Sequence, residues 1–147
     1  MALEKMGLTQ SDVIVNKQQS LNGFVTVPLN TPLDIGTLLI TNDGGLTWST
    51  RQEADWVDGD THATGDVVYH LGHIWESLAD SNTTEPGTDD TKWKDNGFWG
   101  ANGVLVEGLD ESGDANVLTS GYVVSNNLTG YEDALRHQLF NRNIILK

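Results

Sequence analysis

The residues best suited to chemistry are two histidines in the stretch 65–78, which reads GDVVYHLGHIWESL. His70 and His73 flank Leu71-Gly72, a dipeptide that predicts a two-residue turn between two short strands. Such a turn places the two imidazoles opposite each other, in a geometry that could ligate a metal ion. A catalytic zinc site also needs a third protein ligand and an open position, and the spacing fixes no third residue. We therefore interpret the two histidines as exposed polar residues beside a turn.

Other patterns of metal binding or catalysis are also incomplete. The acid-rich stretch 58–66, DGDTHATGD, lacks the regular oxygen spacing and the closing glutamate of a calcium loop. The chain has no Gly-x-Ser-x-Gly motif and no cysteine, and nothing in it predicts a cleft that would raise the pKa of one carboxyl group. We expect no enzyme activity, no metal and no cofactor.

Aromatic residues are the richer signal, because five of them lie close together in the middle of the chain. They are Trp56, Tyr69, Trp75, Trp93 and Trp99. Flat rings can stack on the apolar faces of sugars while nearby acids accept hydroxyl hydrogen bonds. The alternative is that a small unit without disulfides uses its aromatics to build a core, and for any single tryptophan we favour this alternative.

The expected turn also fixes which side chains share a face of the hairpin. Val68 falls opposite Trp75, and Tyr69 falls opposite Ile74. We assign the face of Val68 and Trp75 to the core, together with Trp93, and place the two histidines at its rim. The opposite face then points outward. The candidate glycan contacts are Tyr69, Trp56, Trp99 and Glu76.

Charge is distributed unevenly over the 147 residues, which carry a net charge of −13. Residues 52–100 hold eleven acids, two bases and four of the five tryptophans, whereas residues 1–51 and 101–147 have net charges of −1 and −3. A shift in composition on both sides of a segment is typical of an insertion. The acidic balance argues against a nucleic-acid partner, and no apolar run is long enough for a membrane span.

The chain outside the acidic segment predicts a mainly β (α+β) fold with one C-terminal helix. Residues 1–20 are polar and aperiodic, which favours a flexible arm. We expect four strands, at 23–29, 103–110, 116–126 and 144–147. We also expect a hairpin at 34–50 around Asn-Asp-Gly-Gly and a helix within 128–143.

The helix carries start, packing and stop signals. Thr129 and Glu132 have the spacing of a capping box. Tyr131, Leu135 and Leu139 recur every four residues, as a buried stripe requires. Asn143 follows, where a left-handed conformation would end the helix.

Two stretches outside the acidic segment carry a resemblance to a known family. GTLLITNDGG, beginning at Gly36, and GVLVEGLDESGDANVLTSGYVVSNNL with YEDALRHQLFNRNIILK, beginning at Gly103, resemble the lambda-type (D-like) head decoration proteins of tailed phages. The resemblance implies a trimer at three-fold positions on the outer surface of the expanded capsid. It also implies that the protein braces the head against the pressure of packaged DNA, and that an N-terminal arm orders by pairing with the major capsid protein.

The acidic segment carries a second resemblance. GDVVYHLGHIWESL, followed by EPGTDDTKW, is similar to the small chitin- and cellulose-binding modules of the family 5/12 type. The matching residues are mainly those that determine the fold of such modules. Where sugar-binding members often carry paired aromatics after the second strand, this chain has Ala79 and Asp80. The resemblance therefore implies the fold of an all-β insert. It does not decide whether the insert binds a surface polysaccharide.

Together the two resemblances imply a capsid decoration protein interrupted by an outward module. We expect a capsid-binding arm over 1–22, a decoration domain over 23–52 and 101–147, and a carbohydrate-binding-module-like insert over 53–100. The candidate arm contacts are Val13, Ile14, Val15 and Phe24. The expected partners are the major capsid protein, other copies in a homotrimer and a surface polysaccharide, with no nucleic acid and no membrane. The alternative is a carbohydrate-binding module or phage adhesin without a cementing role.

Overall fold

The computed structural model describes residues 9–147 and divides the chain into two compact units. The flanking unit comprises the chain up to Thr50 and the segment Gly100–Lys147, and the module comprises Arg51–Trp99. Strands account for 40% of the chain and helices for 10%, so the mainly β fold class is confirmed. Among the described residues, no helix has the length and apolar character needed to cross a membrane.

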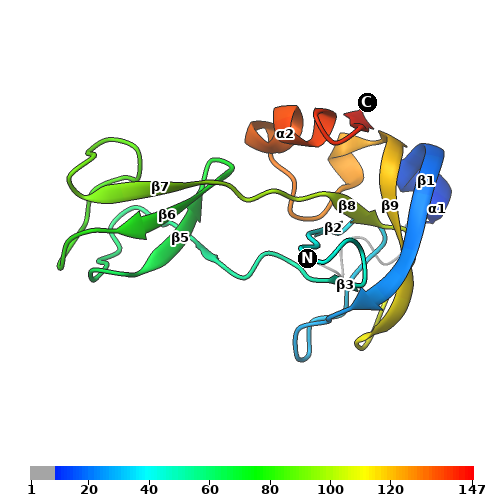
Figure 1. Cartoon of the computed structure of the whole chain (residues 1–147), viewed down its shortest axis with the longest axis horizontal. Helices are drawn as coiled ribbons and strands as arrows, with labels where there is room; N and C mark the ends of the chain where they lie inside the picture. The colour runs from blue at the N-terminus through cyan, green and yellow to red at the C-terminus, as the bar shows by residue number, and fades with distance from the viewer. Residues whose placement is uncertain (1–8) are drawn as a thin grey trace. The chain divides into compact units, whose positions relative to one another are not determined.

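The flanking unit is built on one six-stranded sheet in the order β2-β8-β9-β1-β3, with β10 also paired to β9 (Figure 1). Its strands are β1 (Ile14–Val25), β2 (Leu38–Leu39), β3 (Thr47–Trp48), β8 (Gly103–Leu105), β9 (Gly113–Val123) and β10 (Ile144–Leu146). Its helical segments are α1 (Gln10–Val13), η2 (Ser125–Asn127), η3 (Asp133–Leu135) and α2 (Arg136–Phe140). The strands expected at 23–29, 103–110 and 116–126 are instead observed as β1, β8 and β9, with the limits given above.

The centre of this sheet is the antiparallel pair β1–β9. Ile14 lies opposite Val123 at one end and Val25 lies opposite Gly113 at the other. The strands alternate side chains between two faces, and Val25, Ala115 and Val117 belong to one core cluster with Trp48 of β3. The core cluster of this unit is aliphatic apart from that tryptophan: Val25, Leu33, Leu39, Trp48, Leu105, Ala115 and Val117.

The expected flexible arm needs correction. Residues 14–22 are not a free arm, because they form the first three quarters of β1 and pair with β9 along their length. The side chains of Val13 and Ile14 are buried in the flanking unit, at 0% and 9% exposure. They are therefore core residues here, and only residues 1–8 of the proposed arm lie outside the described part of the chain.

The expected hairpin at 34–50 is present only as a bridge. Ile40 and Ser49 exchange both main-chain hydrogen bonds, while β2 pairs with β8 and β3 pairs in parallel with β1. The turn at Gly44-Gly45 forms as expected, with φ values of 74° and 94°. The hairpin does not extend because its two strands pair with other strands instead: β2 with β8, and β3 with β1.

This bridge explains how the flanking unit accommodates the module. Ser49 precedes the module and bonds Ile40, while Asn102 follows the module and donates its N–H to the Leu39 carbonyl at 3.0 Å. The Asn102 amide also accepts from the Thr41 N–H and donates to its carbonyl. The two ends of the insertion are thus held by one three-residue segment, which satisfies the requirement that an inserted unit start and finish close together.

The C-terminal helix is shorter than expected, and its capping box is absent. Thr129 instead bonds through its main chain to Gly36 and Leu38, which extends the sheet rather than starting a helix. Helical structure begins at Asp133 and ends at Phe140. Leu135 and Leu139 are fully buried, as the stripe predicts. Asn143 adopts φ of 66°, which confirms the left-handed stop before β10.

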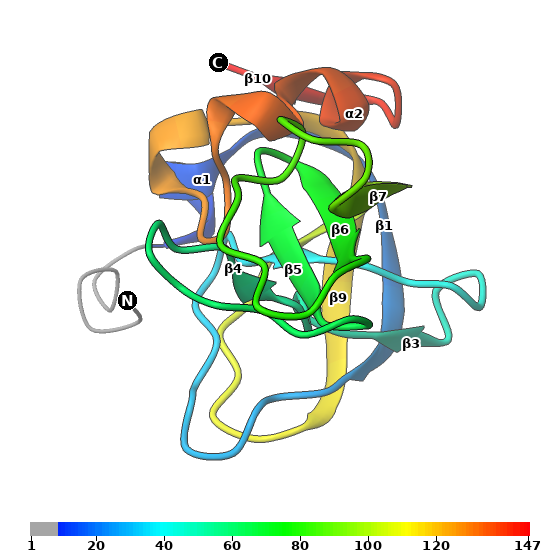
Figure 2. The ribbon, with the colours of Figure 1, turned by 90° about the vertical axis from the view of Figure 1, so that its left-hand side faces the viewer.

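The module is a four-stranded sheet in the order β4-β5-β6-β7, shown in green in Figure 2. Its strands are β4 (Ala54–Asp55), β5 (Val67–His70), β6 (His73–Ser77) and β7 (Trp93–Phe98). β4 runs parallel to β5, and the other pairs are antiparallel. Neighbouring strands are thus joined by a turn, by the loop after β4 and by the long polar loop before β7.

Candidate binding surface of the module

The β5–β6 hairpin has the register that the sequence predicts. Val68 lies opposite Trp75, Tyr69 opposite Ile74, and His70 opposite His73. Leu71 and Gly72 form the turn with φ values of 47° and 86°, which is the left-handed pair that a tight hairpin turn requires. The turn residues therefore fix which side chains share each face.

The core of the module lies at one end of the hairpin face that carries Val68 and Trp75. Val68 and Trp93 are 3% exposed, and Ser77 is fully buried. The buried Asn82 side chain donates to Ser77 Oγ at 3.1 Å and to the Lys92 carbonyl at 3.0 Å. Its carbonyl oxygen accepts from both the N–H and the hydroxyl of Thr84, whose own carbonyl accepts the Trp93 indole N–H at 3.0 Å. An amide network thus takes the place that more aliphatic residues would fill in a larger core.

On the opposite face, Tyr69 is not the exposed aromatic that we expected. Tyr69 is 4% exposed and Trp99 is 6% exposed. The Arg51 guanidinium lies 3.8 Å from the centre of the Tyr69 ring and 5.9 Å from that of Trp99, and the two rings meet edge to face at 6.3 Å. The first and last residues of the module therefore close over Tyr69. This burial removes Tyr69 and Trp99 from the candidate glycan contacts.

Rings that are only partly buried, together with the exposed Phe98, gather beside the turn at the other end of the face that carries Val68 and Trp75. The Trp56 and His70 rings meet at 4.9 Å, and the His73 ring lies 5.9 Å from Trp75 and 4.5 Å from Phe98. The Trp75 indole N–H donates to the His70 carbonyl at 3.3 Å, which joins the two sets of rings. We call these five residues the aromatic row: Trp56, His70, His73, Trp75 and Phe98.

Each histidine of the aromatic row is bonded to a carboxylate. His70 Nε2 lies 2.9 Å from Glu85 Oε1, and His73 Nδ1 lies 2.9 Å from Asp95 Oδ1. Desolvation raises the pKa of Asp95, but hydrogen bonds from His73 and the Gly97 N–H and the nearby His73 charge outweigh it, so the pKa is lowered overall. Asp95 therefore stays ionised beside the rings and offers acceptor oxygens to a ligand.

The arrangement suits a polar ligand with an apolar face. Phe98 is 57% exposed and contributes an open ring, while Glu85 and Asp95 supply carboxylate oxygens at the edge of the row. Glu76 lies on the other face opposite Val67 and Lys94, away from this set. Within residues 9–147, no group of three or more His, Cys, Asp or Glu side chains is placed to hold a metal ion.

Some of the expected site residues belong to this surface and others do not. Trp56 belongs to the aromatic row, and so does Trp75, which we had assigned to the core and which is half-buried. Phe98 was not among the expected contacts; it follows Gly97, which has φ of 98°, where the register between β6 and β7 shifts. Phe24 of the proposed arm is 43% exposed on β1, and Val15 lies in β1 with its side chain outside the description.

Comparison with known proteins supplies no family. No model of a known protein family matches the sequence, and no curated protein matches it significantly.

Proposed function

We propose that the protein decorates the head of a tailed phage. It binds the expanded capsid from outside as a homotrimer, bridges neighbouring copies of the major capsid protein and resists the pressure of packaged DNA. The flanking unit attaches to the shell, and the module faces the surroundings. The proposal draws on the resemblance of the flanking sequence to lambda-type decoration proteins, and one structural observation carries it further.

That observation is the open edge of β1. Over residues 14–22 one edge of β1 pairs with β9, while β3 reaches the other edge only at Phe24 and Val25. Among the described residues no other strand pairs with β1, so its N-terminal half presents main-chain donors and acceptors. Such an edge can add a strand from a partner, and here it continues from the N-terminal segment that the resemblance assigns to capsid contact.

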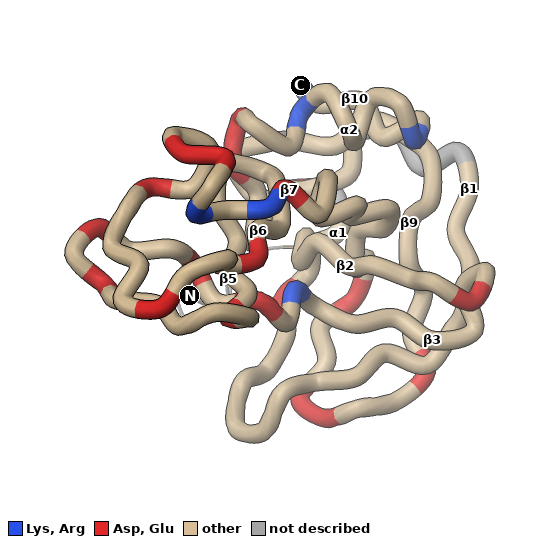
Figure 3. Tube along the Cα trace, turned by 60° about the vertical axis from the view of Figure 1, so that its left-hand side comes forward, with Lys and Arg blue, Asp and Glu red and all other residues tan. Residues whose placement is uncertain are grey.

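The insertion geometry supports an outward module. Its two ends are anchored to residues 39–41, so the module can project without interrupting the sheet. The module carries eleven acids and three bases. Figure 3 shows acidic positions distributed along its loops. A strongly acidic outer surface would keep decorated particles apart in solution.

Binding to expanded heads tests the proposal. Heads with and without added protein are imaged by electron microscopy, and bound protein is measured by co-sedimentation. We expect density at three-fold positions and saturable binding. In a second arm Leu21→Lys, which puts a charge on the open edge of β1, should weaken binding, whereas Val57→Lys, at a comparably exposed aliphatic residue of the module, should not. Absence of density on heads would contradict the proposal.

The aromatic row favours a second function, glycan binding by the module. Retardation of the protein in gels that contain chitin, cellulose or host polysaccharide would show it. Trp56→Ala and Phe98→Ala should each abolish the retardation, and Val67→Ala, at a side chain 41% exposed on the other face of the hairpin, should leave it unchanged. Equal mobility of all proteins with and without polysaccharide would exclude this function.

A further inference from the structure

Three asparagines in the chain are followed directly by glycine: Asn22, Asn96 and Asn102. Such a pair is chemically labile, because glycine has no side chain to shield its main-chain nitrogen from the asparagine amide before it. That nitrogen can attack the amide carbon and close a five-membered ring. In a folded chain the reaction needs an exposed asparagine and a main chain with room to form the ring. The three pairs have very different surroundings in the structure.

The pair Asn102-Gly103 is held by hydrogen bonds and by the core. The Asn102 amide accepts the Thr41 N–H at 3.0 Å and donates to the Thr41 carbonyl at 3.1 Å. Gly103 belongs to β8 and is buried, and a Cβ atom there would lie 2.5 Å from the Trp48 ring. Ring closure would therefore break both amide bonds and displace main chain that packs against the core tryptophan.

The pair Asn22-Gly23 lies within the long ladder of β1 and β9. Asn22 Nδ2 donates to Asn116 Oδ1 on β9 at 3.3 Å. Gly23 pairs with Ala115 and is buried, and a Cβ atom there would lie 2.9 Å from the Trp48 ring. Closing a ring here would distort the central strand pair of the flanking unit. Although the Asn22 side chain is exposed, its main chain is therefore not free to react.

The pair Asn96-Gly97 lies in the module, in a bulge of β7. Asp95 pairs with β6 on one side of the bulge and Phe98 pairs with β6 on the other. Asn96 and Gly97 thus lie together opposite a single residue of β6, outside the regular ladder. Asn96 is exposed, Gly97 has φ of 98°, and a Cβ atom at Gly97 would meet nothing within 4 Å. Both requirements of the reaction are met at this pair.

The carboxylate of Asp95 lies next to the nitrogen that has to react. Its Oδ1 accepts the Gly97 N–H at 2.8 Å. Desolvation raises the pKa of Asp95, but hydrogen bonds from His73 and the Gly97 N–H outweigh it, so the pKa is lowered and the group stays ionised. An ionised carboxylate in hydrogen-bond reach of a proton can act as its acceptor. Asp95 is thus placed to take the proton that Gly97 loses.

We propose that Asn96 is a site of spontaneous deamidation in the folded protein. The Gly97 nitrogen attacks Cγ of Asn96, so that an N–C bond forms and the Cγ–Nδ2 bond breaks. The proton from Gly97 passes to the acceptor, solvent supplies one to the leaving Nδ2, and ammonia departs. Water then opens the succinimide ring at either of its carbonyl carbons. The products are aspartate at this position or isoaspartate, in which the main chain runs through Cγ.

Both products would change one edge of the aromatic row. Aspartate puts a second carboxylate beside Asp95, where the like charges repel each other. Isoaspartate lengthens the main chain of β7 by one carbon just before Phe98, which displaces the exposed ring of the row. The reaction is a property of this chain and water alone. It goes beyond the proposed function and depends on neither head binding nor glycan binding.

Peptide mapping of the aged protein tests the proposal. The whole chain is kept at mildly alkaline pH, and mass spectrometry with fragmentation follows the gain of about one dalton at each asparagine. We expect Asn96 to convert at least about tenfold faster than Asn22 and Asn102, because the attacking geometry is accessible only there. In the chain unfolded by guanidinium the three pairs should convert at similar rates, since the folded surroundings that distinguish them are gone.

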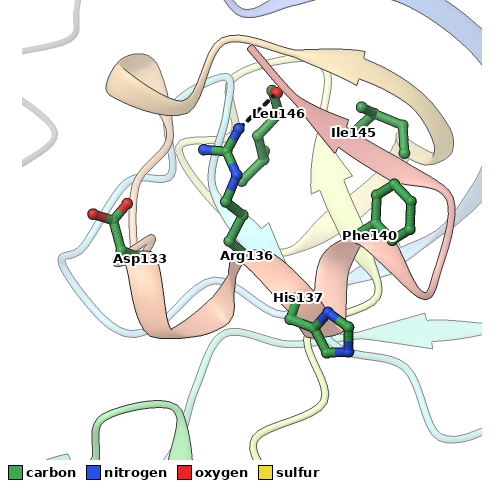
Figure 4. Close-up of a pocket in the computed structure, with 6 residues that line it drawn as sticks. All are labelled: Asp133, Arg136, His137, Phe140, Ile145 and Leu146. Carbon is green, nitrogen blue, oxygen red and sulfur yellow. Dashed lines mark hydrogen bonds between the residues drawn. The ribbon is translucent and has the colours of Figure 1, made fainter.

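Asn141 is the matched control for exposure alone. It is an exposed residue in the turn from α2 to β10 and is followed by Arg142, whose side chain shields the nitrogen. Figure 4 shows this turn between Phe140 and Ile145, beside a hollow of about 460 Å³. We expect Asn141 to stay unconverted while Asn96 reacts.

The variant Asn96→Gln separates deamidation from other effects of age. Its longer side chain has to close a six-membered ring, which forms far more slowly, so this position should stay unmodified. Hydrogen exchange compares the aged wild type with the aged variant. The wild type should lose protection in β6 and β7, whereas the variant and the flanking unit of both proteins should keep theirs.

Three results would overturn the proposal: no conversion at Asn96 in the folded chain, equal rates at the three Asn-Gly pairs in the folded chain, or conversion at Asn141 as fast as at Asn96. Complete conversion with unchanged exchange in β6 and β7 would contradict the expected change of the aromatic row. Loss of protection that is the same in Asn96→Gln would show that age acts on the module through another reaction.

Discussion

The flanking unit and the module build their buried cores from different kinds of side chain. The flanking unit buries aliphatic residues on strands that are distant in sequence, around the single large ring of Trp48. The module buries Trp93 against an amide network and closes Arg51 and Trp99 over Tyr69. A unit of about 50 residues buries a smaller share of its surface than a larger one. It therefore depends on a few rings and on satisfied polar groups, where the flanking unit depends on many aliphatic contacts.

The largest expected effect comes from removing the central ring of each unit. Trp48→Ala and Trp93→Ala should each cost about 3–5 kcal/mol of unfolding free energy, because each leaves a large cavity. Hydrogen exchange followed by mass spectrometry measures where protection is lost. We expect Trp93→Ala to expose Arg51–Trp99 and Trp48→Ala to expose the flanking unit. Loss of protection throughout the chain in both variants would show that the two units unfold as one.

Removal of the buried amide should discriminate between the two kinds of core. Asn82→Ala removes one hydrogen-bond partner each from the Lys92 carbonyl, the Ser77 hydroxyl and Thr84, and should cost about 1–3 kcal/mol. Thermal unfolding of the module measures the loss. The matched change Asn22→Ala, at an exposed side chain of β1, should shift the transition far less. Equal shifts would mean that the network adds nothing to the module.

A turn substitution should strengthen the module alone. Leu71 holds φ of 47° and is 60% exposed, so its side chain adds strain and little packing. Leu71→Asn gives the Asn-Gly pair that such turns favour and should stabilise the module by about 0.5–1 kcal/mol. Chemical denaturation with a tryptophan probe measures the gain. A destabilised variant would indicate that the Leu71 side chain makes a contact that stabilises the module.

The smallest expected effect is a pH dependence in the flanking unit. Hydrogen bonds from the hydroxyl and N–H of Thr47 and from the Thr41 hydroxyl lower the pKa of Asp43 to about 2. Because the folded pKa lies below the unfolded value of about 3.9, this contribution is complete above that value and is lost as pH falls toward 2. Unfolding of wild type and Asp43→Asn at pH 5 and pH 2.5 should show a difference that shrinks at the lower pH. A difference independent of pH would contradict this origin.

Local signals predicted the structure best. The Leu71-Gly72 turn, the Gly44-Gly45 turn and the stop at Asn143 each depend on the conformation of one or two residues, and all three form. The hairpin register followed from its turn alone. These features could be read from the sequence because their partners are neighbours in it.

Long-range pairing could not be read in the same way. The partner of β1 is β9, which lies on the far side of the module in the sequence, so the N-terminal segment looked like an arm. Thr129 has the residue type of a helix cap, but Gly36 and Leu38 take its main chain into the sheet. The candidate site moved for a similar reason. Strand alternation placed Tyr69 on the outer face, but Arg51 and Trp99, which are distant from it in the sequence, pack against its ring.

The central claim is that the flanking unit attaches the protein to the phage head while the module is dispensable for attachment. Electron microscopy of expanded heads with the full chain, and with a chain in which a short Gly-Ser linker replaces residues 52–98, tests it most directly. We predict density at the same three-fold positions for both proteins, with the outer part missing from the shortened chain. Attachment that disappears with the module, or no density for either protein, would contradict the account.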